Sequence, residues 1–192
     1  MVLFKKNTTE NLCYLLWREE VNREEWVSQM ATWARCSPRR ALSLLIDGTL
    51  QSAEQENIAA EVKNVTAEEI QYVRLVERDS VDIRRENVCY LTDTRQHRVK
   101  MKDVADSIGV KNFTLTRWKN EEQMPSPSNL RELCRFYGLS RDVDPESDPI
   151  FLLPLPIGDT RRREWLYDRI KDLESTTLQD LFPALERLLR EP

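Results

Sequence analysis

The stretch from Met101 to Leu139 constrains the fold of this chain more than any other. Apolar side chains recur at helical spacing on both sides of Gly109, which predicts two short helices joined by a tight turn. Glycine adopts the positive φ that such a turn needs at little steric cost. The small side chain of Ala105 would let the two helices approach closely. One small core is expected from Val104, Ala105, Ile108, Val110, Leu115 and Trp118.

A third helix is expected to follow, from Ser126 to Tyr137, ending at Gly138 as a natural residue after a helix C-terminus. Two short helices joined in this way form a helix-turn-helix, whose second helix enters the major groove of DNA. The polar face of that second helix is expected to carry Lys111, Asn112, Thr114, Thr116, Arg117 and Lys119. These side chains can bind base edges and phosphates, so the stretch predicts DNA recognition.

The same stretch resembles the Cro/C1-type helix-turn-helix of phage repressors and xenobiotic-response-element regulators, a lambda-repressor-like bundle. The matching positions are Val104-Ala105, Gly109-Val110, Leu115, Arg117-Trp118 and Pro125-Ser126. One departure is Glu121, which stands where the family has a glycine close to the phosphate backbone. An acidic residue there weakens the expected contact. Asn120 is expected to take the left-handed conformation instead, because asparagine tolerates it.

The resemblance implies that different side chains of the second helix contact phosphates and base edges. Lys111 and the adjoining backbone N–H groups would meet phosphate, while Asn112, Phe113 and Arg117 would reach base edges. Arginine pairs with guanine, asparagine pairs with adenine, and an aromatic ring packs on the thymine methyl group. Phosphate contacts add affinity without sequence choice. Lys102 and Lys119 are expected to make such contacts, and Thr114, Thr116 and Asn120 complete the expected DNA-binding set.

A near repeat predicts a second copy of this unit. The five-residue segments that begin at Asn11 and Asn87 are NLCYL and NVCYL and lie 76 residues apart. Self-similarity of this kind suggests two copies of one unit. In the first copy Ser37 is a plausible N-cap, with proline after it at the first helical position. Gly48 is expected to end that helix. Between Ala31 and Gly48 there is one residue more than between Ala105 and Glu121. The first copy is therefore expected to have a longer turn that lacks the glycine.

The outward face of this first reading helix is expected to carry Arg39, Arg40 and Ser43 as further candidate DNA contacts. The alternative is a solvated basic pair with no role in binding. The match of this copy to the family is weaker than that of the second copy.

The predicted fold is all-α, with two tandem helix-turn-helix bundles and a C-terminal helical pair. Residues 1–80 would form a degenerate helix-turn-helix domain, residues 81–144 the Cro/C1-type domain, and residues 145–192 a proline-containing linker with the last two helices. A helix from Thr66 to Arg78, begun by a capping box with Glu69, would approach or cross the first boundary. The apolar run from Ile150 to Leu153 is expected to dock on the rest of the chain.

The last helix has leucines at helical spacing, at Leu178, Leu181, Leu185, Leu188 and Leu189. Such a stripe would complete the core of the protein or form a dimer interface, and completion of the core is the commoner case. The basic triplet Arg161, Arg162 and Arg163 would touch phosphate or form a solvated helix face.

The composition of the chain limits the other classes of protein to which it could belong. The net charge is −4, yet residues 81–145 have 12 basic and 10 acidic side chains, so the excess of positive charge falls on the Cro/C1-like stretch. No segment approaches the roughly 20 apolar residues of a membrane span, and the N-terminus lacks the pattern of a secretory signal. A cytoplasmic protein without membrane contact is expected.

Catalytic and metal-binding motifs are not apparent in the sequence. The four cysteines are widely scattered and His97 is the single histidine, so zinc and disulfides are not expected. The thiols are expected to be buried in helix cores, and His97 is expected at the end of a surface helix. Without a glycine-rich phosphate loop, or a nucleophile with a paired base, no enzyme activity and no cofactor are predicted.

The predicted function is therefore sequence-specific binding of double-stranded DNA by a transcriptional regulator, a repressor, with the helix that begins near Asn112 in the major groove. The expected partners are a DNA operator and a second copy of the chain. In one arrangement, the two units of one chain bind two half-sites about 34 Å apart. In the other, the chain forms a homodimer through its C-terminal helices, and each subunit contributes two DNA-binding units. The alternative function is a non-enzymatic protein–protein interaction module that reuses the helix-turn-helix fold.

Overall fold

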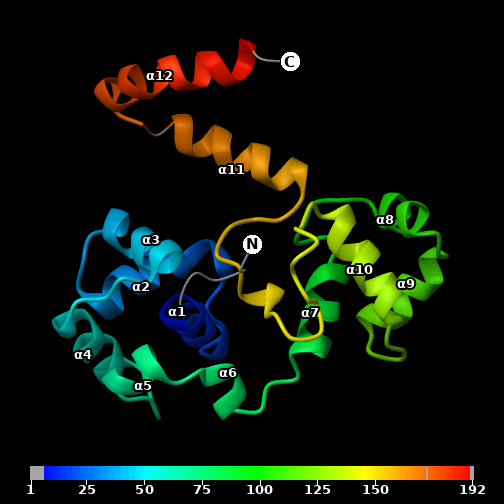
Figure 1. The fold of residues 1–192 in the computed structure, drawn as a ribbon, viewed down its shortest axis with the longest axis horizontal. Coiled ribbons are helices and arrows are strands. Elements are labelled where there is room, and N and C mark those ends of the chain that lie inside the picture. The colour runs from blue at the N-terminus through cyan, green and yellow to red at the C-terminus, as the bar shows by residue number, and fades with distance from the viewer. Residues whose placement is uncertain (1–6, 172, 191–192) are drawn as a thin grey trace.

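The computed structural model describes residues 7–171 and 173–190. Every regular element in this part of the chain is helical, which confirms the predicted all-α class (Figure 1). A first group of helices comprises α1 (Asn7–Arg18), η1 (Arg23–Glu25), α2 (Trp26–Ala34), α3 (Pro38–Asp47), α4 (Ser52–Glu61), α5 (Ala67–Tyr72) and α6 (Leu75–Arg78). A second group comprises α7 (Ile83–Thr92), α8 (Met101–Ile108), α9 (Asn112–Lys119), α10 (Pro127–Phe136) and η2 (Ile150–Leu152), and is followed by α11 (Asp159–Lys171) and α12 (Ser175–Arg190).

Helix α1 is the central element of the first group, because α2, α3, α5 and α6 all pack against it. Its residues Leu12, Leu15 and Leu16 are fully buried, as expected for helical spacing of apolar side chains. Gly48 ends α3 with a φ of 62°, which confirms the predicted stop. It lies so close to α1 that a Cβ atom there would be 2.8 Å from the backbone nitrogen of Thr9.

In the second group, α7 and α8 both pack against α9 and α10. The predicted core is confirmed at its centre, where Val104, Ala105, Leu115 and Trp118 are at most 1% exposed. Ile108 is buried as well, and Val110 packs against this core while remaining partly exposed. Helix α10 has Ser126 as its N-cap and stops before Gly138, which has a φ of 68°, so the third helix is also confirmed.

The asparagines of the near repeat are both completely buried, and both bind backbone groups near the end of their own helical group. The Asn11 amide donates to the Ile70 and Val73 carbonyls at 2.9 and 2.6 Å. Its carbonyl accepts from the N–H of Leu75, 64 residues further along the chain. A buried amide that satisfies several backbone groups fixes their conformation, because leaving them unpaired would be costly.

Asn87 makes the equivalent contacts in the second group. Its amide donates to the Pro145 and Asp148 carbonyls at 2.9 and 2.8 Å. Its carbonyl accepts from the N–H of Phe151, again 64 residues further along. The repeat in the sequence thus corresponds to a repeated tertiary contact.

The predicted single helix from Thr66 to Arg78 is wrong, because the chain forms α5 and α6 with a break between them. The capping box at its start is confirmed by hydrogen bonds in both directions between Thr66 and Glu69. The break has a clear cause. Asn11 binds the carbonyl of Ile70 and the N–H of Leu75, groups that a continuous helix would use in its own ladder.

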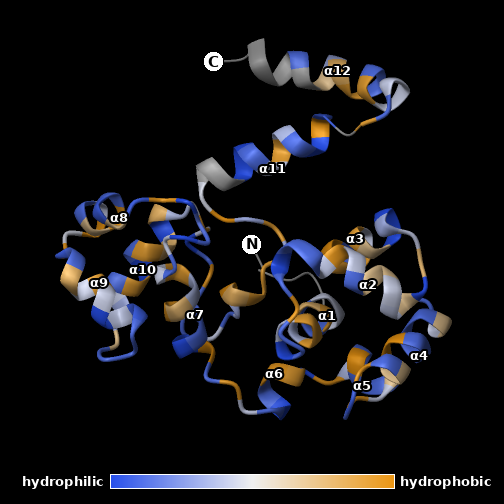
Figure 2. Ribbon diagram, turned by 180° about the vertical axis from the view of Figure 1, so that it is seen from behind, coloured by the Kyte–Doolittle hydropathy of each residue, from blue (hydrophilic) through white to orange (hydrophobic). Residues whose placement is uncertain are grey.

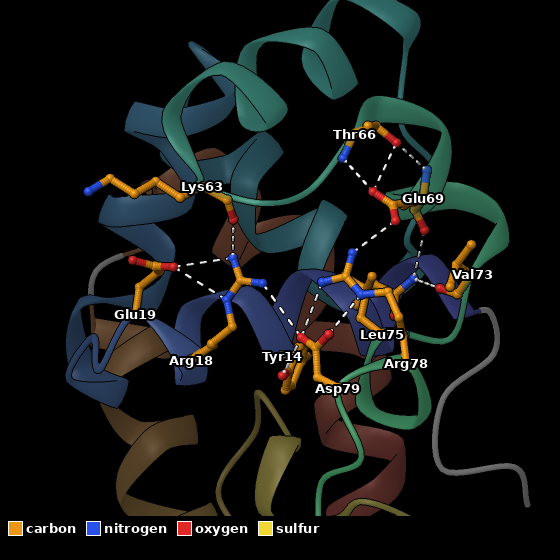
Figure 3. Close-up of polar contacts among 11 residues, drawn as sticks. Tyr14, Arg18, Glu19, Lys63, Thr66, Glu69, Val73, Leu75, Arg78 and Asp79 are labelled. Atoms are coloured by element: carbon orange, nitrogen blue, oxygen red, sulfur yellow. Dashed lines mark hydrogen bonds and ion pairs between the residues drawn. The ribbon is translucent and has the colours of Figure 1, made fainter.

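The segment that joins the two groups is fastened to α1 by polar contacts around Asp79 (Figure 3). The Tyr14 hydroxyl and the Arg78 guanidinium donate to its carboxylate at 2.8 and 2.7 Å. The hydrogen bond from Arg78 is the main cause that lowers the pKa of Asp79. Burial and the carboxylate raise the pKa of Tyr14 to about 12. Asp79, just before the predicted boundary after residue 80, is therefore held against the first group.

The two groups are joined through η2, whose Ile150, Phe151 and Leu152 are buried, so the expected docking of this apolar run is confirmed. The Phe151 ring meets the Trp17 ring of α1 edge to face, at a centroid distance of 4.9 Å. Figure 2 shows hydrophobic segments of α1 and of the chain around η2 between the two groups. The buried apolar residues of both groups consequently form one continuous core.

Arg23 adds a polar connection between the groups. Its guanidinium lies 4.6 Å from the ring centroids of both Trp26 and Tyr90. The same guanidinium donates to the carbonyls of Phe151 and Leu153. One arginine of the first group thus binds a ring of α7 and the backbone around η2.

Helices α11 and α12 stand apart from the body in both views (Figures 1 and 2). An ion pair of 3.1 Å joins Arg98 to Glu164 of α11. Leu178 is half-buried and Leu181 is 43% exposed, so completion of the core by the leucine stripe is wrong at Leu181. The side chains of Leu185, Leu188, Leu189 and Arg161 lie outside the described residues, whereas Arg162 and Arg163 are exposed.

Among the described residues, no helix has the length and apolar character needed to cross a membrane.

Candidate nucleic-acid interface

The turn between α8 and α9 is closed by two backbone hydrogen bonds. The N–H of Gly109 donates to Asp106 at 3.4 Å, and the N–H of Val110 donates to Ala105 at 3.0 Å. Gly109 has a φ of 72°, as its predicted role requires. This pair of bonds is the Schellman motif, which ends a helix on a left-handed residue and turns the chain sharply. Three residues therefore separate the end of α8 from the start of α9.

The N-terminal half of α9 presents its polar side chains to solvent. Lys111, Asn112 and Phe113 are exposed, and the Phe113 side chain is 68% exposed. Within the described chain, Lys111 and Asn112 have no side-chain hydrogen bond or ion pair, and neither does Lys102 on α8. Thr114 is half-buried. These side chains are available to a ligand.

The C-terminal half of α9 is engaged with the rest of the protein. Lys119 forms a 3.2 Å ion pair with Asp93, at the C-terminal end of α7. The Arg117 Nε lies 3.8 Å from a carboxylate oxygen of Glu122, and its guanidinium lies 5.8 Å from the ring centroid of Phe113. The Thr116 hydroxyl donates to the carbonyl of Asn112 within the helix. Both basic side chains of this half are thus oriented by internal partners.

The expectation that Asn120 takes the left-handed conformation is wrong, since its φ is −85° and Glu121 has a φ of 61° instead. The reason is a second Schellman motif. The N–H of Glu121 donates to Trp118 and the N–H of Glu122 donates to Arg117, which places Glu121 at the left-handed position. The exposed Asn120 amide donates to the Glu122 carboxylate at 3.2 Å.

The Glu121 carboxylate points back to α7. It lies 2.7 Å from a guanidinium nitrogen of Arg85 and accepts from the Cys89 thiol at 3.5 Å. Burial, followed by this carboxylate, raises the pKa of Cys89 to about 11. The acidic residue at the glycine position of the family pattern is therefore paired with a cation of the same helical group.

The α2–α3 turn of the first group has the same length as the α8–α9 turn, so the predicted longer turn is wrong. Arg35 takes the place of the glycine with a φ of 51°. The N–H of Cys36 donates to Ala31, as that of Val110 donates to Ala105. The extra residue lies after the turn, because the ten residues of α3 precede Gly48, whereas the eight residues of α9 and Asn120 precede Glu121.

The predicted start of α3 is confirmed, because the Ser37 hydroxyl accepts from the N–H of Arg40 and Pro38 is the first helical residue. Arg39 is exposed and Ser43 is half-buried. Arg40 is held by Glu54 of α4, with both bonds between them at 2.8 Å. The structure thus directs the Arg40 side chain to a partner within its own group.

The Arg40–Glu54 contact is a bidentate ion pair in which the Glu54 side chain is 10% exposed. The Arg40 guanidinium also donates to the carbonyl of Thr49 at 2.7 Å. Its hydrogen bonds are the main cause that lowers the pKa of Glu54, and the same pair raises the pKa of Arg40. These three bonds use Nε and Nη2, so Nη1 is the one guanidinium nitrogen left for a base edge.

Helices α3 and α9, the two helices expected to contact DNA bases, are not adjacent. Both views place α3 and α9 on opposite sides of the molecule, with α1 and α7 between them (Figures 1 and 2). The structure therefore brings Lys102, Lys111, Asn112, Phe113 and Arg117 together on one unit, and leaves Arg39, Arg40 and Ser43 on the other.

The expectation for His97 is wrong. The imidazole is 3% exposed and lies between the rings of Tyr90 and Tyr137, at centroid distances of 4.7 and 4.6 Å. Its Nε2 is 2.8 Å from the carbonyl of Tyr90. His97 is thus part of the core.

The cysteines are free thiols, and their expected burial is confirmed at Cys13 and Cys134. Cys36 and Cys89 are half-buried. The described residues contain no cluster of acidic, histidine and cysteine side chains that could hold a metal ion.

Three residues of the site escaped sequence reasoning, namely Glu54, Arg85 and Asp93. Each of them is an ion-pair partner of a predicted contact or of Glu121. They come from other helices than their partners, so their pairing depends on the tertiary fold. Glu122 is evident in the sequence as an acidic residue beside the predicted reading helix, where it favours the protein-interaction alternative, but its contact with Arg117 was not predicted.

The fold and the exposed start of α9 define a helix-turn-helix within the second group. In agreement, residues 95–143 match the family model described as helix-turn-helix. That match supports a DNA-binding transcription regulator of the Cro/C1 type in general terms, and it spans α8, the turn, α9 and α10. No curated protein and no solved structure matches the chain.

Proposed function

We propose that this protein binds double-stranded DNA sequence-specifically and represses transcription, with α9 in the major groove of an operator. The observation that carries this proposal is the exposed start of α9, where Lys111, Asn112 and Phe113 project from a segment that matches the helix-turn-helix model. A major groove of about 12 Å admits a helix presented in this way.

The roles of the side chains follow from their chemistry. The first backbone N–H groups of α9 and Lys111 bind phosphate, since a helix N-terminus attracts anions. Asn112, Phe113 and Arg117 contact base edges, while Lys102 and Lys119 contact phosphate. Thr114, Thr116 and Asn120 line the same surface. Pairing of Glu121 with Arg85 supports this arrangement, because the paired cation offsets a carboxylate that would otherwise face the phosphate backbone.

We further propose that the first group is a degenerate helix-turn-helix unit and that residues 81–144 form the reading unit. The equivalent contacts of Asn11 and Asn87, and the equal length of the two turns, support two copies of one unit. The predicted boundary at residue 144 separates η2 from α7, although these two elements pack together. Arg39 and Ser43 remain candidate contacts of the first unit, whereas Arg40 is committed to Glu54.

The alternative, a non-enzymatic protein-interaction module, is favoured by the charge of the protein and by the first unit. Helix α3 exposes Ile46 to 37%, beside the half-buried Leu42. An apolar pair on the outer face is better suited to contact with a partner protein than to contact with a base edge. This observation applies to the first unit only.

We also propose that the protein is a homodimer through α11 and α12. Leu166, Tyr167, Leu181 and Phe182 are exposed by 49, 68, 43 and 59% on these two helices. Burial of such side chains against a second copy would remove apolar area from water, which is the main driving force of association.

Selection of bound duplexes from a random pool by the purified protein tests the proposed function. We expect an enriched motif, and we expect Arg117→Ala to lose discrimination at one guanine of it by roughly tenfold or more. Lys111→Ala is expected to weaken binding to every duplex and to flatten the salt dependence. Arg135→Ala, on the outer face of α10, is the control with the same loss of charge. Absence of any enriched motif would contradict sequence-specific binding.

A further inference from the structure

The end of α9 contains a small polar cluster formed by Arg117, Asn120 and Glu122. One oxygen of the Glu122 carboxylate lies 3.8 Å from the Arg117 Nε, and the other accepts from the Asn120 amide at 3.2 Å. The N–H of Glu122 donates to the carbonyl of Arg117 at 2.9 Å, so the backbone that carries the carboxylate is itself fixed to the helix. The backbone of the cluster is therefore anchored, while the side chains of Arg117 and Glu122 are 40 and 53% exposed and lie within ion-pair distance.

This arrangement restricts the Arg117 side chain on two sides. The Phe113 ring lies one turn earlier, 5.8 Å from the guanidinium, and the Glu122 carboxylate lies beyond the last turn. The shortest distance to the Glu122 carboxylate is from Nε, so the carboxylate lies on the Nε side of the guanidinium. The two terminal nitrogens are the pair that reaches O6 and N7 of a guanine.

The inference, which rests on the proposed function, concerns what Glu122 does there. We propose that Glu122 is a positioning residue for Arg117 and thereby determines specificity for guanine. A long arginine side chain loses rotamer freedom when it binds, and a side chain already held in one direction loses less. The benefit appears at the correct base alone, since a misplaced base does not meet the fixed guanidinium.

The same carboxylate lowers affinity for all DNA. A negative charge next to the reading helix is repelled by phosphates whatever the sequence. Glu122 therefore weakens non-specific binding while it improves the match at one position. Discrimination obtained by a repulsive element together with an attractive one is a general route to specificity.

Glu121 provides a matched control, because it is the adjacent residue, has the same side chain and lies in the same turn. Its carboxylate is paired with Arg85 of α7 at 2.7 Å, and not with Arg117. Glu121→Gln therefore removes the same charge from the same turn without changing the surroundings of the Arg117 guanidinium. A pure charge effect would appear in both variants, and a positioning effect only in Glu122→Gln.

The test measures dissociation constants of the full-length wild type, Glu122→Gln and Glu121→Gln. Each is measured on the selected duplex, on duplexes with each guanine of the motif replaced in turn, and on a scrambled duplex. We expect both variants to bind the scrambled duplex more tightly. We expect only Glu122→Gln to lose discrimination, by roughly fivefold or more at the guanine read by Arg117. Circular dichroism melting curves verify that the variants are folded.

Three outcomes would overturn the inference, and they differ in cause. Equal loss of discrimination in both variants would show a pure charge effect. Full retention by Glu122→Gln, while the wild type discriminates, would show that Arg117 needs no positioning. A wild type that does not discriminate at all would refute the proposed function itself.

Discussion

At the scale of single residues, the hydrogen bonds of a Schellman motif decide which residue takes a positive φ. Gly109 takes it at little steric cost, because glycine has no Cβ atom. Arg35 and Glu121 occupy the same position of the same motif, with φ of 51° and 61°. The side chain of Asn120 suggested a left-handed residue one position too early. The identity of Glu121 is explained by Arg85, which no local pattern indicates.

Two glycines allow the cost of positive φ to be separated from the cost of crowding. Gly48→Ala places a Cβ atom 2.3 Å from the Thr9 hydroxyl oxygen and 2.8 Å from the backbone nitrogen of the same residue. Gly109→Ala meets nothing within 4 Å, although its φ is also positive. We expect Gly109→Ala to lower the free energy of unfolding by about 1–2 kcal/mol. We expect Gly48→Ala to lower it by about 1–3 kcal/mol more.

Urea unfolding monitored by circular dichroism measures both changes. An equal loss in the two variants would contradict the close approach of α3 to α1.

At the scale of helices, the sequence predicted most elements, and its failures share a physical cause. Helical spacing and capping residues located α3, α10 and the start of α9 to within a residue. The break between α5 and α6 was missed, because it depends on the Asn11 side chain, which comes from a helix far earlier in the chain. His97 was misplaced for a similar reason, since Tyr90 and Tyr137 enclose it only in the folded protein.

The buried asparagines are expected to be essential to the ends of their helical groups. Asn87→Ala leaves the carbonyls of Pro145 and Asp148 and the N–H of Phe151 without this partner. Each unsatisfied buried group costs about 1–3 kcal/mol, so we expect the free energy of unfolding to fall by roughly 3 kcal/mol or more.

Asn11→Ala is expected to cause a similar loss, because Asn11 makes the equivalent contacts. Asn129→Ala is the control, since the Asn129 side chain has no hydrogen bond within the described residues. Thermal unfolding of the three variants measures the effect. A tolerated Asn87→Ala with a damaging Asn11→Ala would argue against two copies of one unit.

At the scale of the whole molecule, the body is one unit with a single continuous core, and the C-terminal pair stands apart from it. Arg23 and the Trp17–Phe151 contact connect the two groups. These contacts fix α3 and α9 on opposite sides of the molecule. An operator that contacts both helices of one chain would have to bend around the protein. Otherwise, the two helices would have to come from different subunits of a dimer. Sequence spacing predicted two copies of one unit but not how the two helical groups are oriented, because the contacts between the groups are tertiary.

The proposed dimer predicts that a charge on the exposed face of α12 dissociates the protein. We expect Phe182→Asp to convert a dimer to a monomer in size-exclusion chromatography with light scattering, because the buried carboxylate would be unpaired. Tyr72→Asp introduces the same charge at an aromatic that is 68% exposed on α5 and should leave the mass unchanged. A monomeric wild type would contradict the proposal.

Contact between the start of α9 and DNA bases is tested most directly by photo-crosslinking. A benzophenone amino acid in place of Phe113 is compared with the same replacement of Tyr72, because both side chains are 68% exposed. We predict that position 113 crosslinks to a base of the selected duplex, that excess unlabelled duplex of the same sequence abolishes the product, and that position 72 gives none. No crosslink at position 113, or equal crosslinks at both positions, would contradict recognition of DNA by α9.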